Sequence, residues 1–339
     1  MDNRDYMVRA VELSMSGLGK TFPNPIVGAV IVSALGEVIG EGFHAGGDHA
    51  EVLALKDCAA HSNSPKGATL YVTLEPCNHF GKTPPCTEAL IKAGIARVIF
   101  ALKDPNPTAK GGESNLLAAG IEVTSGLLEA EAREANRSWL HKIEVGRPFL
   151  IWKIASTLDG FSAAVDGTSK WITSEDSRKS VQRLRAESDV IVIGTGTALA
   201  DNPSLLPRGD SRRPIRMIVG AREIPGDSIL RDGQARTIFL RSRNLDTLID
   251  SLNELGVNQV LIESGATLGT SLLKENLIDE IQWYQAPSIL GAGMKAIGDL
   301  NIRTISHRVN FDVIKVERSG LDTLTVLRSA LRERVEANS

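Results

Sequence analysis

The feature that most restricts the fold of this 339-residue chain is the alternation of short apolar strands with helical segments. Alternation with short connections predicts a mostly parallel sheet that helices cover on both faces. The elements expected in the first half are a helix at 4–17, a strand hairpin at 26–33 and 37–43, a helix at 49–60, a strand at 68–74, a helix at 84–94, a strand at 96–102, a helix around 116–119, a strand at 121–126 and a helix at 128–144.

The second half continues this alternation and predicts a second α/β domain. With ~150 residues per domain as a guide, a chain of 339 residues suits two domains. The stretch from Gly146 to Pro148 separates them, so we expect domains at 1–146 and 147–339. The elements expected here are a strand at 149–157, a helix at about 174–186, and strands at 189–194, 215–220, 237–240, 259–264 and 280–287.

Charge and composition argue against some classes of protein. A formal net charge of −3 does not suit a nucleic-acid-binding protein that relies on a broad basic surface. No stretch reaches the ~20 apolar residues of a membrane span, and the amino-terminal residues contain no apolar run. We therefore expect neither a membrane anchor nor a signal peptide. Three cysteines, an odd number, fit a reducing compartment, so the cytoplasm is the expected location.

The most informative polar segment is TLEPCNHFGKTPPC at 73–86, which contains Cys77 and Cys86. Both cysteines are expected at or near the start of a helical turn, with Thr83 as an N-cap. Helix N-termini lower the pKa of a thiol, and thiolate is the form that binds a metal. His49, at the start of the preceding helix, is the candidate third ligand. One histidine and two cysteines leave one position of a tetrahedral zinc site open, which is typical of catalytic sites.

Glu51 is the candidate for proton transfer in this site. It follows His49 by two residues, so the two side chains diverge by roughly 200° on a helix. At a helix N-terminus, however, both can border the same opening. A carboxylate that does not bind the zinc can take a proton from water and deliver one to the leaving ammonia. The order H-x-E followed by P-C-x-x-C is typical of zinc deaminases that act on nucleobases. Here eight residues separate Cys77 from Cys86.

Other interpretations remain open from these residues alone. A single histidine or cysteine is more often a packed residue than a metal ligand. A zinc ion closed by His79 as fourth ligand would be structural, and the first domain would then be a zinc-stapled binding module. A further alternative is a nucleoside or tRNA deaminase with an unrelated appended domain. Turnover of cytidine rather than of another pyrimidine would favour this alternative.

The combination of HAE at 49–51 with TLEPCNHFGKTPPC resembles the bifunctional riboflavin-biosynthesis deaminase–reductase family. The segments PNPIVGAVIV and DPNP match the same family. The resemblance implies a cytidine-deaminase-like α/β/α domain, a zinc cofactor, and a pyrimidinone substrate that carries a ribosylamino group and a 5′-phosphate. It also implies that the substrate pocket is lined by Asn24, His44, His79, Lys82, Asp104 and Asn106.

A nucleotide-binding loop is harder to find in the second half. VIVIGTGTALADNP contains Gly194 and Gly196, but Leu199 occupies the place of the third glycine of a dinucleotide-binding fingerprint. LIESGATLGTSLL is expected to form a strand, a tight turn at Gly265 and a helix whose first N–H groups can hold a phosphate. Turns of this kind are about as common without a ligand.

The segments KIASTLDG, SKWITS, LRAESD, TALADNPSL and ESGATL resemble, in order, the reductase domain of the same family, which is similar to dihydrofolate reductase and uses NADPH. By position, the resemblance implies NADPH contacts at Ala155, Trp171, Thr197, Asp201, Gly265, Ala266, Thr267 and Leu268. It implies substrate contacts at Ser169, Arg185, Leu205, Arg208 and Glu263. Of these, Arg185 and Arg208 suit a clamp for the substrate phosphate.

The implied second reaction is hydride transfer from NADPH to C1′ of the ribose, which opens the ring to a ribityl chain. Lys153, Asp201 and Glu263 are the polar residues expected to take part in this chemistry. Ser264 departs from the family, which commonly has glycine or alanine there. Related deaminases usually assemble, so we expect a homo-oligomer. We assign no function to the residues after 295.

Overall fold

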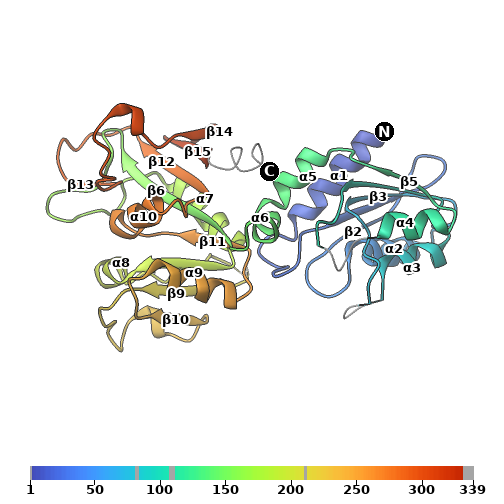
Figure 1. The fold of residues 1–339 in the computed structure, drawn as a ribbon, viewed down its shortest axis with the longest axis horizontal. Helices are drawn as coiled ribbons and strands as arrows, with labels where there is room; N and C mark the ends of the chain where they lie inside the picture. The colour runs from blue at the N-terminus through green and yellow to red at the C-terminus, as the bar shows by residue number, and fades with distance from the viewer. Residues whose placement is uncertain (1, 81–83, 107–110, 210–211, 331–339) are drawn as a thin grey trace. The chain divides into compact units, whose positions relative to one another are not determined.

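The computed structural model of the chain describes residues 2–80, 84–106, 111–209 and 212–330. The chain forms two compact units, Met1–Gly146 and Arg147–Ser339 (Figure 1). Each unit has a central sheet with helices packed against it. Among the described residues, no helix combines the length and the apolar character that crossing a membrane requires.

The sheet of the first unit has the strand order β2-β1-β3-β4-β5. Its strands are β1 (Gly28–Val32), β2 (Val38–Phe43), β3 (Thr69–Leu74), β4 (Arg97–Leu102) and β5 (Glu122–Ser125). β1 pairs antiparallel with β2 and β3, whereas β3 with β4 and β4 with β5 are parallel. The expectation of a mostly parallel sheet is wrong for this unit, because a hairpin with a short connection must pair antiparallel.

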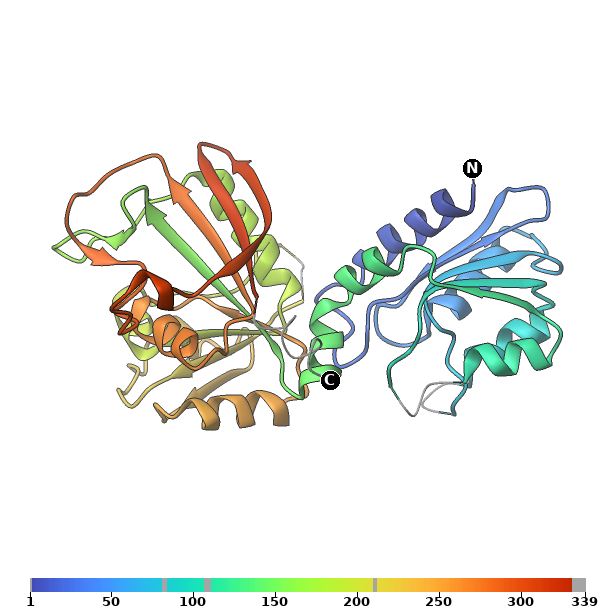
Figure 2. The ribbon, with the colours of Figure 1, turned by 45° about the horizontal axis from the view of Figure 1, so that its top comes forward.

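Helices cover both faces of this sheet (Figures 1 and 2). They are α1 (Asn3–Met15), α2 (Ala50–Ala60), α3 (Cys86–Ala93), α4 (Gly112–Ala118), α5 (Glu129–Ala135) and α6 (Arg137–Val145). α1 and α5 contact each other and one face, while α2, α3 and α4 follow one another on the opposite face. β1, β3 and β4 are buried along almost their whole length, which explains why they are apolar without alternation.

The helix expected at 128–144 is interrupted at Asn136, which separates α5 from α6. The buried Asn136 side chain accepts a hydrogen bond from the backbone N–H of Ile26 and donates one to its carbonyl, both at 2.9 Å. These two bonds fix the segment that leads into β1. The expectation of one continuous helix is wrong because this partner lies 110 residues away in sequence, where no local pattern reveals it.

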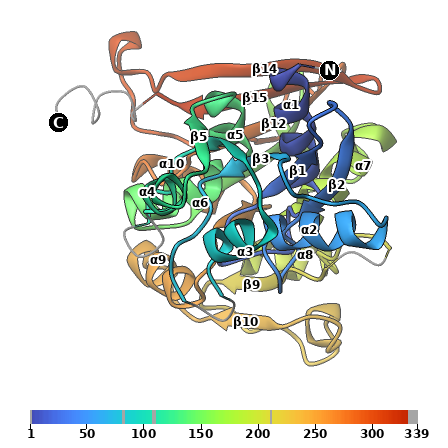
Figure 3. The same cartoon turned by 90° about the vertical axis from the view of Figure 1, so that its right-hand side faces the viewer.

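The larger sheet of the second unit has the order β10-β9-β8-β11-β6-β12-β15-β14, and β13 pairs with β7. The strands are β6 (Phe149–Thr157), β7 (Phe161–Ala163), β8 (Val190–Gly194), β9 (Ile215–Val219), β10 (Thr237–Leu240), β11 (Gln259–Ile262), β12 (Glu280–Ala286), β13 (Met294–Lys295), β14 (Phe311–Ser319) and β15 (Asp322–Ser329). From β10 to β12 all neighbouring strands are parallel. β15 and β14 extend the sheet as a long antiparallel hairpin (Figure 3).

The helices of this unit are α7 (Glu175–Glu187), α8 (Thr195–Asp201), α9 (Leu245–Glu254) and α10 (Ala266–Lys274), with 3₁₀ turns η1 (Ile229–Arg231) and η2 (Ile305–His307). α7 begins where expected because Ser174 accepts a hydrogen bond from the N–H of Ser177. α10 packs closely on β6 because Gly269 has no side chain. A Cβ atom at Gly269 would lie 2.1 Å from the indole ring of Trp152.

Candidate active sites

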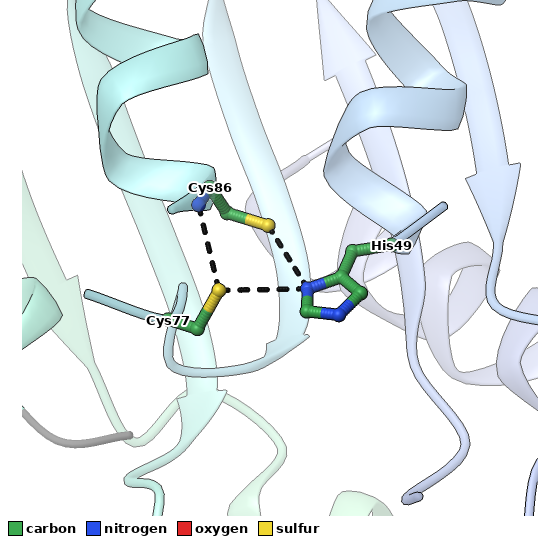
Figure 4. A group of neighbouring side chains, drawn as sticks. All are labelled: His49, Cys77 and Cys86. Atoms are coloured by element: carbon green, nitrogen blue, oxygen red, sulfur yellow. Dashed lines mark hydrogen bonds between the residues drawn. The ribbon is translucent and has the colours of Figure 1, made fainter. Parts of the chain in front are cut away.

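The three predicted zinc ligands meet at one point of the first unit (Figure 4). His49 is the N-cap residue of α2, Cys86 is the first residue of α3, and Cys77 lies in the loop after β3. The Nδ1 atom of His49 lies 3.2 Å from the Sγ of Cys86 and 3.5 Å from the Sγ of Cys77. The ligand atoms all lie within 4.8 Å of one another, and this donor set suits zinc.

The start of α3 differs from the expectation, which is wrong about the cap. Pro85 occupies the N-cap position, and Thr83 lies outside the described residues. Cys86 therefore stands in the first turn, where its backbone N–H faces the Cys77 sulfur at 3.4 Å. Hydrogen bonds from Cys86 and His49 lower the pKa of Cys77 to about 4, so this thiol is ionised at neutral pH.

The Cys86 thiol has the opposite tendency. Its contact with Cys77 and its burial raise the pKa of Cys86. Without a metal, two adjacent thiols favour the state in which only one of them is ionised, because two neighbouring negative charges repel each other. A bound cation reverses this preference, because a coordinated thiol is deprotonated. The pair is therefore adapted to a metal ion rather than to free thiolates.

Glu51 lies in the first turn of α2, and its side chain is buried beside the ligands. Its carboxylate interacts with the Cys86 thiol, which His49 also contacts, so Glu51 and His49 lie on the same side of the start of α2. Burial raises the pKa of Glu51 to about 7. In the part of the chain that the structure describes, the ligand cluster has three members and does not include His79. Three protein ligands are the number that catalytic zinc sites use, whereas structural zinc sites normally have four.

Asn24 and His44 lie next to the ligands. The His44 and His49 rings meet edge to face with centroids 5.6 Å apart. The Nδ1 atom of His44 is 3.0 Å from the carbonyl oxygen of Asp48, so this nitrogen carries the proton. Its Nε2 then accepts from the amide of Asn24 at 3.4 Å. Burial lowers the pKa of His44 and keeps the ring neutral.

His79, Asp104 and Asn106 form a second group beside the cluster. Burial is the main cause that raises the pKa of Asp104. The nearby Cys77 raises this pKa further, whereas the nearby His79 lowers it. Asp104 accepts a hydrogen bond from the N–H of Asn106 at 2.8 Å. The Nδ1 atom of His79 is buried and has no hydrogen-bond partner in the described structure, so it is free for a ligand. Lys82 lies outside the described residues.

Glu75 is a buried residue that sequence reasoning did not select, although it stands two positions before Cys77. Its carboxylate accepts hydrogen bonds from the backbone N–H of Asp104 at 3.3 Å and of Glu113 at 3.0 Å. It therefore ties the loop after β3 to the loop after β4 and to the start of α4. The only signal in the sequence is an acidic residue at the end of an apolar strand.

The second unit contains a cleft of about 1130 Å³. Its floor lies at the carboxyl ends of β8, β9, β10 and β11, which are parallel, and it reaches residues of β6, α7 and α10. Ligands of open α/β sheets bind at this edge because the connecting loops diverge there.

Three charged side chains meet in this cleft. Glu263, directly after β11, binds Arg185 of α7 through two hydrogen bonds of 2.5 and 2.9 Å. Lys153 of β6 lies 3.6 Å from the same carboxylate. Burial alone would raise the pKa of Glu263, but the charges of Arg185 and Lys153 lower it to about 2. Glu263 is therefore ionised at every physiological pH, and Lys153 has an anionic partner.

The cleft brings together the predicted residues of the second unit with one exception. Besides Lys153, Arg185 and Glu263, its lining includes Ala155, Ser169, Trp171, Thr197, Asp201, Arg208, Gly265, Ala266, Thr267 and Leu268. The exception is Leu205, whose side chain is buried in the apolar core with Leu184 and Ile218.

Several groups in this cleft are free for a cofactor. The buried Oγ of Ser264 has no hydrogen-bond partner among the described residues. Gly265 is the N-cap of α10, and a Cβ atom there would meet nothing within 4 Å, so the first turn of this helix is open. Exposed N–H groups at such a start suit the phosphates of NADPH. Arg222, Ser242 and Arg243 also line the cleft. They lie outside every motif, so the sequence offered no signal for them.

Two family matches cover the two units. Residues 1–102 match the cytidine and deoxycytidylate deaminase zinc-binding region. Residues 148–325 match the RibD C-terminal domain.

Relatives match nearly the whole chain. The riboflavin biosynthesis protein RibD of Mycobacterium tuberculosis is 42% identical over 331 residues, with 95% of this chain and 96% of the relative covered. RibD of Escherichia coli is 38% identical over 363 residues, with 95% and 98% covered.

Solved structures agree. The Thermotoga maritima diaminohydroxyphosphoribosylaminopyrimidine deaminase/5-amino-6-(5-phosphoribosylamino)uracil reductase is 33% identical, with a TM-score of 0.88 and coverage of 96% and 98%. RibD of Acinetobacter baumannii is 38% identical, with the same TM-score and coverage. The chain therefore belongs to the RibD family of bifunctional riboflavin-biosynthesis enzymes, which join a zinc-dependent deaminase to an NADPH-dependent reductase.

Proposed function

We propose that residues 1–146 deaminate 2,5-diamino-6-(5-phosphoribosylamino)pyrimidin-4(3H)-one and that residues 147–339 reduce the ribosyl group of the product to ribityl. The observation that carries the first half is the three-ligand cluster of His49, Cys77 and Cys86 with buried Glu51 beside it. The second half is supported by the cleft that holds Lys153 against an ionised carboxylate. The Thermotoga maritima relative carries both activities in its name.

In the proposed deamination, bound zinc supplies a Lewis acid that activates water at neutral pH. Glu51 takes a proton from the attacking water and gives a proton to the departing amine. Water and the C–NH₂ group thereby become C=O and ammonia. The burial of Glu51 supports this role, because a carboxylate shielded from bulk water exchanges its proton with the reacting atoms rather than with solvent.

The groups around the cluster have proposed roles in holding the pyrimidinone. Asn24, His44, His79, Asp104 and Asn106 offer hydrogen-bonding groups near the ligands. The unpartnered Nδ1 of His79 is the group that most needs a ligand atom. We keep Lys82 as a proposed phosphate or ring contact from sequence alone.

In the proposed reduction, NADPH supplies the hydride that reaches C1′ of the ribose. As the bond from C1′ to the ring oxygen breaks, that oxygen needs one proton to become a hydroxyl group. We assign this proton to Lys153, whose ammonium group lies beside Glu263. The carboxylate orients Lys153 and Arg185, and Asp201 is a further polar group of the cleft.

Arg208 is the proposed anchor of the substrate phosphate. The Nε and Nη2 groups of Arg185 already bind Glu263, which leaves this arginine less free than sequence alone suggests. Arg208 lines the same cleft, and its backbone N–H binds Gln182 on the face of α7 that carries Arg185. Its guanidinium group makes no hydrogen bond to a described residue and suits a phosphate. Leu205 remains a proposed contact from the resemblance alone.

A two-step assay on the purified protein tests both activities. The diaminopyrimidinone phosphate is added first without NADPH, and ammonia and the pyrimidine product are measured. NADPH is then added, and its oxidation and the ribityl product are followed. We expect ammonia in the first step and NADPH oxidation only in the second. Zinc-loaded protein that releases no ammonia would refute the deaminase assignment, and ammonia release without later oxidation of NADPH would refute the reductase assignment.

We propose that the protein is a homo-oligomer and that β14 is its contact. β14 lies at the edge of the larger sheet, and Val313 and Val316 are 64% and 60% exposed. If two copies of β14 paired antiparallel about Val316, Lys315 of each copy would face Glu317 of the other. Light scattering after chromatography should then show that Val316→Lys lowers the molar mass of the particle. An unchanged mass would argue against this contact.

The cytoplasm remains the proposed location. Cys58, Cys77 and Cys86 are all free and buried in the structure, as expected in a reducing compartment.

A further inference from the structure

The reductase cleft has a basic end that neither reacting group explains. Arg222 and Arg243 line it, are exposed, and make no hydrogen bond or ion pair with any described residue. Two other arginines of the cleft are engaged: Arg185 binds Glu263, and Arg178 stacks on Trp171 with 4.3 Å between its guanidinium carbon and the ring centre. A third, Arg208, is free as well but lies beside α7 as the proposed anchor of the substrate phosphate. Two unpaired guanidinium groups in one concave site indicate an anionic ligand.

The positions of these arginines follow from the strand order. Arg222 follows β9 and Arg243 follows β10, on the edge of the sheet where Glu263 follows β11. In the order β10-β9-β8-β11, three steps of ~4.8 Å separate β11 from β10, or roughly 14 Å. The basic end therefore lies well away from Lys153 and Glu263. This distance suits a dinucleotide whose nicotinamide ring lies near Lys153 and Glu263 and whose adenosine end lies near the two arginines.

Three glycines lie between the two ends of the cleft. Gly194, Gly196 and Gly220 all line the cleft. A Cβ atom at Gly196 would lie 2.9 Å from the Nη2 of Arg222, so the guanidinium group rests directly against this glycine. Thr197, one residue further, is a proposed cofactor contact. The two arginines thus border the cofactor side of the cleft, whereas Arg208 lies beside α7 on the substrate side.

We propose that Arg222 and Arg243 bind the 2′-phosphate of the adenosine ribose of NADPH and thereby select NADPH over NADH. A phosphate monoester carries close to two negative charges and accepts hydrogen bonds from the planar guanidinium fork, whereas NADH has only a hydroxyl group at this position. Enzymes that prefer NAD place a carboxylate there to bind the ribose hydroxyls. The neighbouring acid, Glu223, does not line the cleft and pairs with Arg241 at 3.7 Å.

This inference rests on the proposed reductase function, and a binding experiment tests it without turnover. The full-length protein and the variants Arg222→Ala, Arg243→Ala and their double variant are titrated with NADPH, NADH, adenosine 2′,5′-bisphosphate and ribose 5-phosphate. Trp152 and Trp171 line the cleft, so tryptophan fluorescence reports binding. We expect each single variant to raise the Kd of NADPH and of the bisphosphate by about 10- to 100-fold. The Kd of NADH should change less than about threefold, because NADH lacks the group that the arginines contact.

Arg241→Ala is the matched control, because it removes the same charge two residues before Arg243 from a side chain outside the cleft. Its Kd for NADPH should stay within about threefold of the parent value, since exposed charge pairs contribute little. The proposal would be overturned if the arginine variants lost affinity for NADPH and NADH equally, or lost affinity for neither nucleotide. Weakened binding of ribose 5-phosphate with unchanged NADPH affinity would overturn it too, and would assign the arginines to the substrate. Failure of the parent protein to bind either nucleotide would instead refute the reductase assignment and the inference with it.

Discussion

The two candidate sites are built in different ways. In the first unit, three ligand atoms within 4.8 Å come from the starts of two helices and from the loop after β3. In the second unit, the lining of the cleft is drawn from the ends of parallel strands and from α7 and α10. The first site is a cluster of a few side chains, whereas the second is a surface that the strand order assembles.

This difference determines what a mutation does. Removing one ligand from a three-ligand cluster removes the metal, because no neighbouring group replaces it. Removing one residue from a broad cleft weakens a single contact and leaves the rest in place. We therefore expect all-or-none effects in the first unit and graded effects in the second.

The largest expected effect is that of Cys86→Ser. This change removes a thiolate ligand, so the protein should lose its zinc and its deaminase activity together. Glu51→Gln should lower deamination by about 10²- to 10⁴-fold while keeping the zinc, because the amide cannot transfer the proton. Zinc content measured by mass spectrometry, together with ammonia release, separates the two roles.

In both variants, reduction of the separately supplied deaminated intermediate should stay at the parent rate. A drop in reduction would show that the two sites are not independent. Full deamination by Glu51→Gln would instead favour a zinc ion that only holds the loop together.

The second largest expected effect is that of Glu263→Gln. It tests whether removing a single residue of the cleft can have as large an effect as removing a zinc ligand. The variant removes the common partner of Arg185 and Lys153. It should lower reduction by at least about 100-fold, since both cations lose their fixed positions. It should also destabilise the second unit by about 3 kcal/mol near neutral pH, as judged from the lowered pKa of Glu263. Glu254→Gln, an exposed change in α9, should shift stability by less than about 0.5 kcal/mol.

The pH dependence of this difference is a sharper test. Because the folded-state pKa of Glu263, about 2, lies below the ordinary 4.5, the ion cluster stabilises the unit above about pH 4.5. This stabilisation is lost as the pH falls from 4.5 toward 2. Thermal unfolding curves of the parent and Glu263→Gln proteins should therefore converge in acid. A gap in Tm that stays constant down to pH 2.5 would contradict the assignment of the lowered pKa to this carboxylate.

Sequence reasoning predicted the meeting of His49, Cys77 and Cys86 because these residue types, in this order, have few uses other than zinc binding. It also predicted most of the strands, whose burial on both faces leaves continuous apolar runs. It missed the break at Asn136 and the contacts of Glu75, because their partners lie far away in sequence or are backbone groups. The roles of such residues are set by tertiary contacts that no local spacing encodes.

Asn136→Ala tests whether the compact site depends on a distant contact. The change leaves the N–H and the carbonyl of Ile26 buried without partners, and each such group costs about 1–3 kcal/mol. We expect the first unit to lose about 2–4 kcal/mol, with a raised KM for deamination because the segment that carries Asn24 loosens. Denaturant unfolding and steady-state kinetics measure the two effects.

Asn63→Ala is the control, because its side chain is exposed and makes a single 3.3 Å hydrogen bond to the carbonyl of Ile39. It should have little effect on either measurement. If Asn136→Ala changed stability but left the KM unaltered, the deaminase site would be more local than we infer.

The cleft was harder to predict because its residues share an edge of the sheet rather than a motif. Arg222 and Arg243 follow two strands whose neighbours are known only from the strand order. Leu205 is a different case: its side chain lies in the core, and the substrate contact that the resemblance implies there stays a prediction. Resemblance transfers positions along the chain, but the direction of a side chain depends on the backbone at that position, here with φ of 61°.

The smallest expected effect separates packing from binding within the cleft. Gly269→Ala would place a Cβ atom 2.1 Å from the ring of Trp152, so α10 or the indole must move. Overpacking of this kind costs about 1–3 kcal/mol. Because α10 carries the proposed cofactor turn, the Kd of NADPH should rise together with the loss of stability.

Gly265→Ala is the matched change at the other end of the turn, where an added Cβ atom meets nothing within 4 Å. It should lower Tm less than Gly269→Ala does, by no more than the small cost of alanine at an N-cap, and should weaken the binding of NADPH. If Gly265→Ala lowered Tm as much as Gly269→Ala, the turn would be a packed structural element rather than an open binding surface.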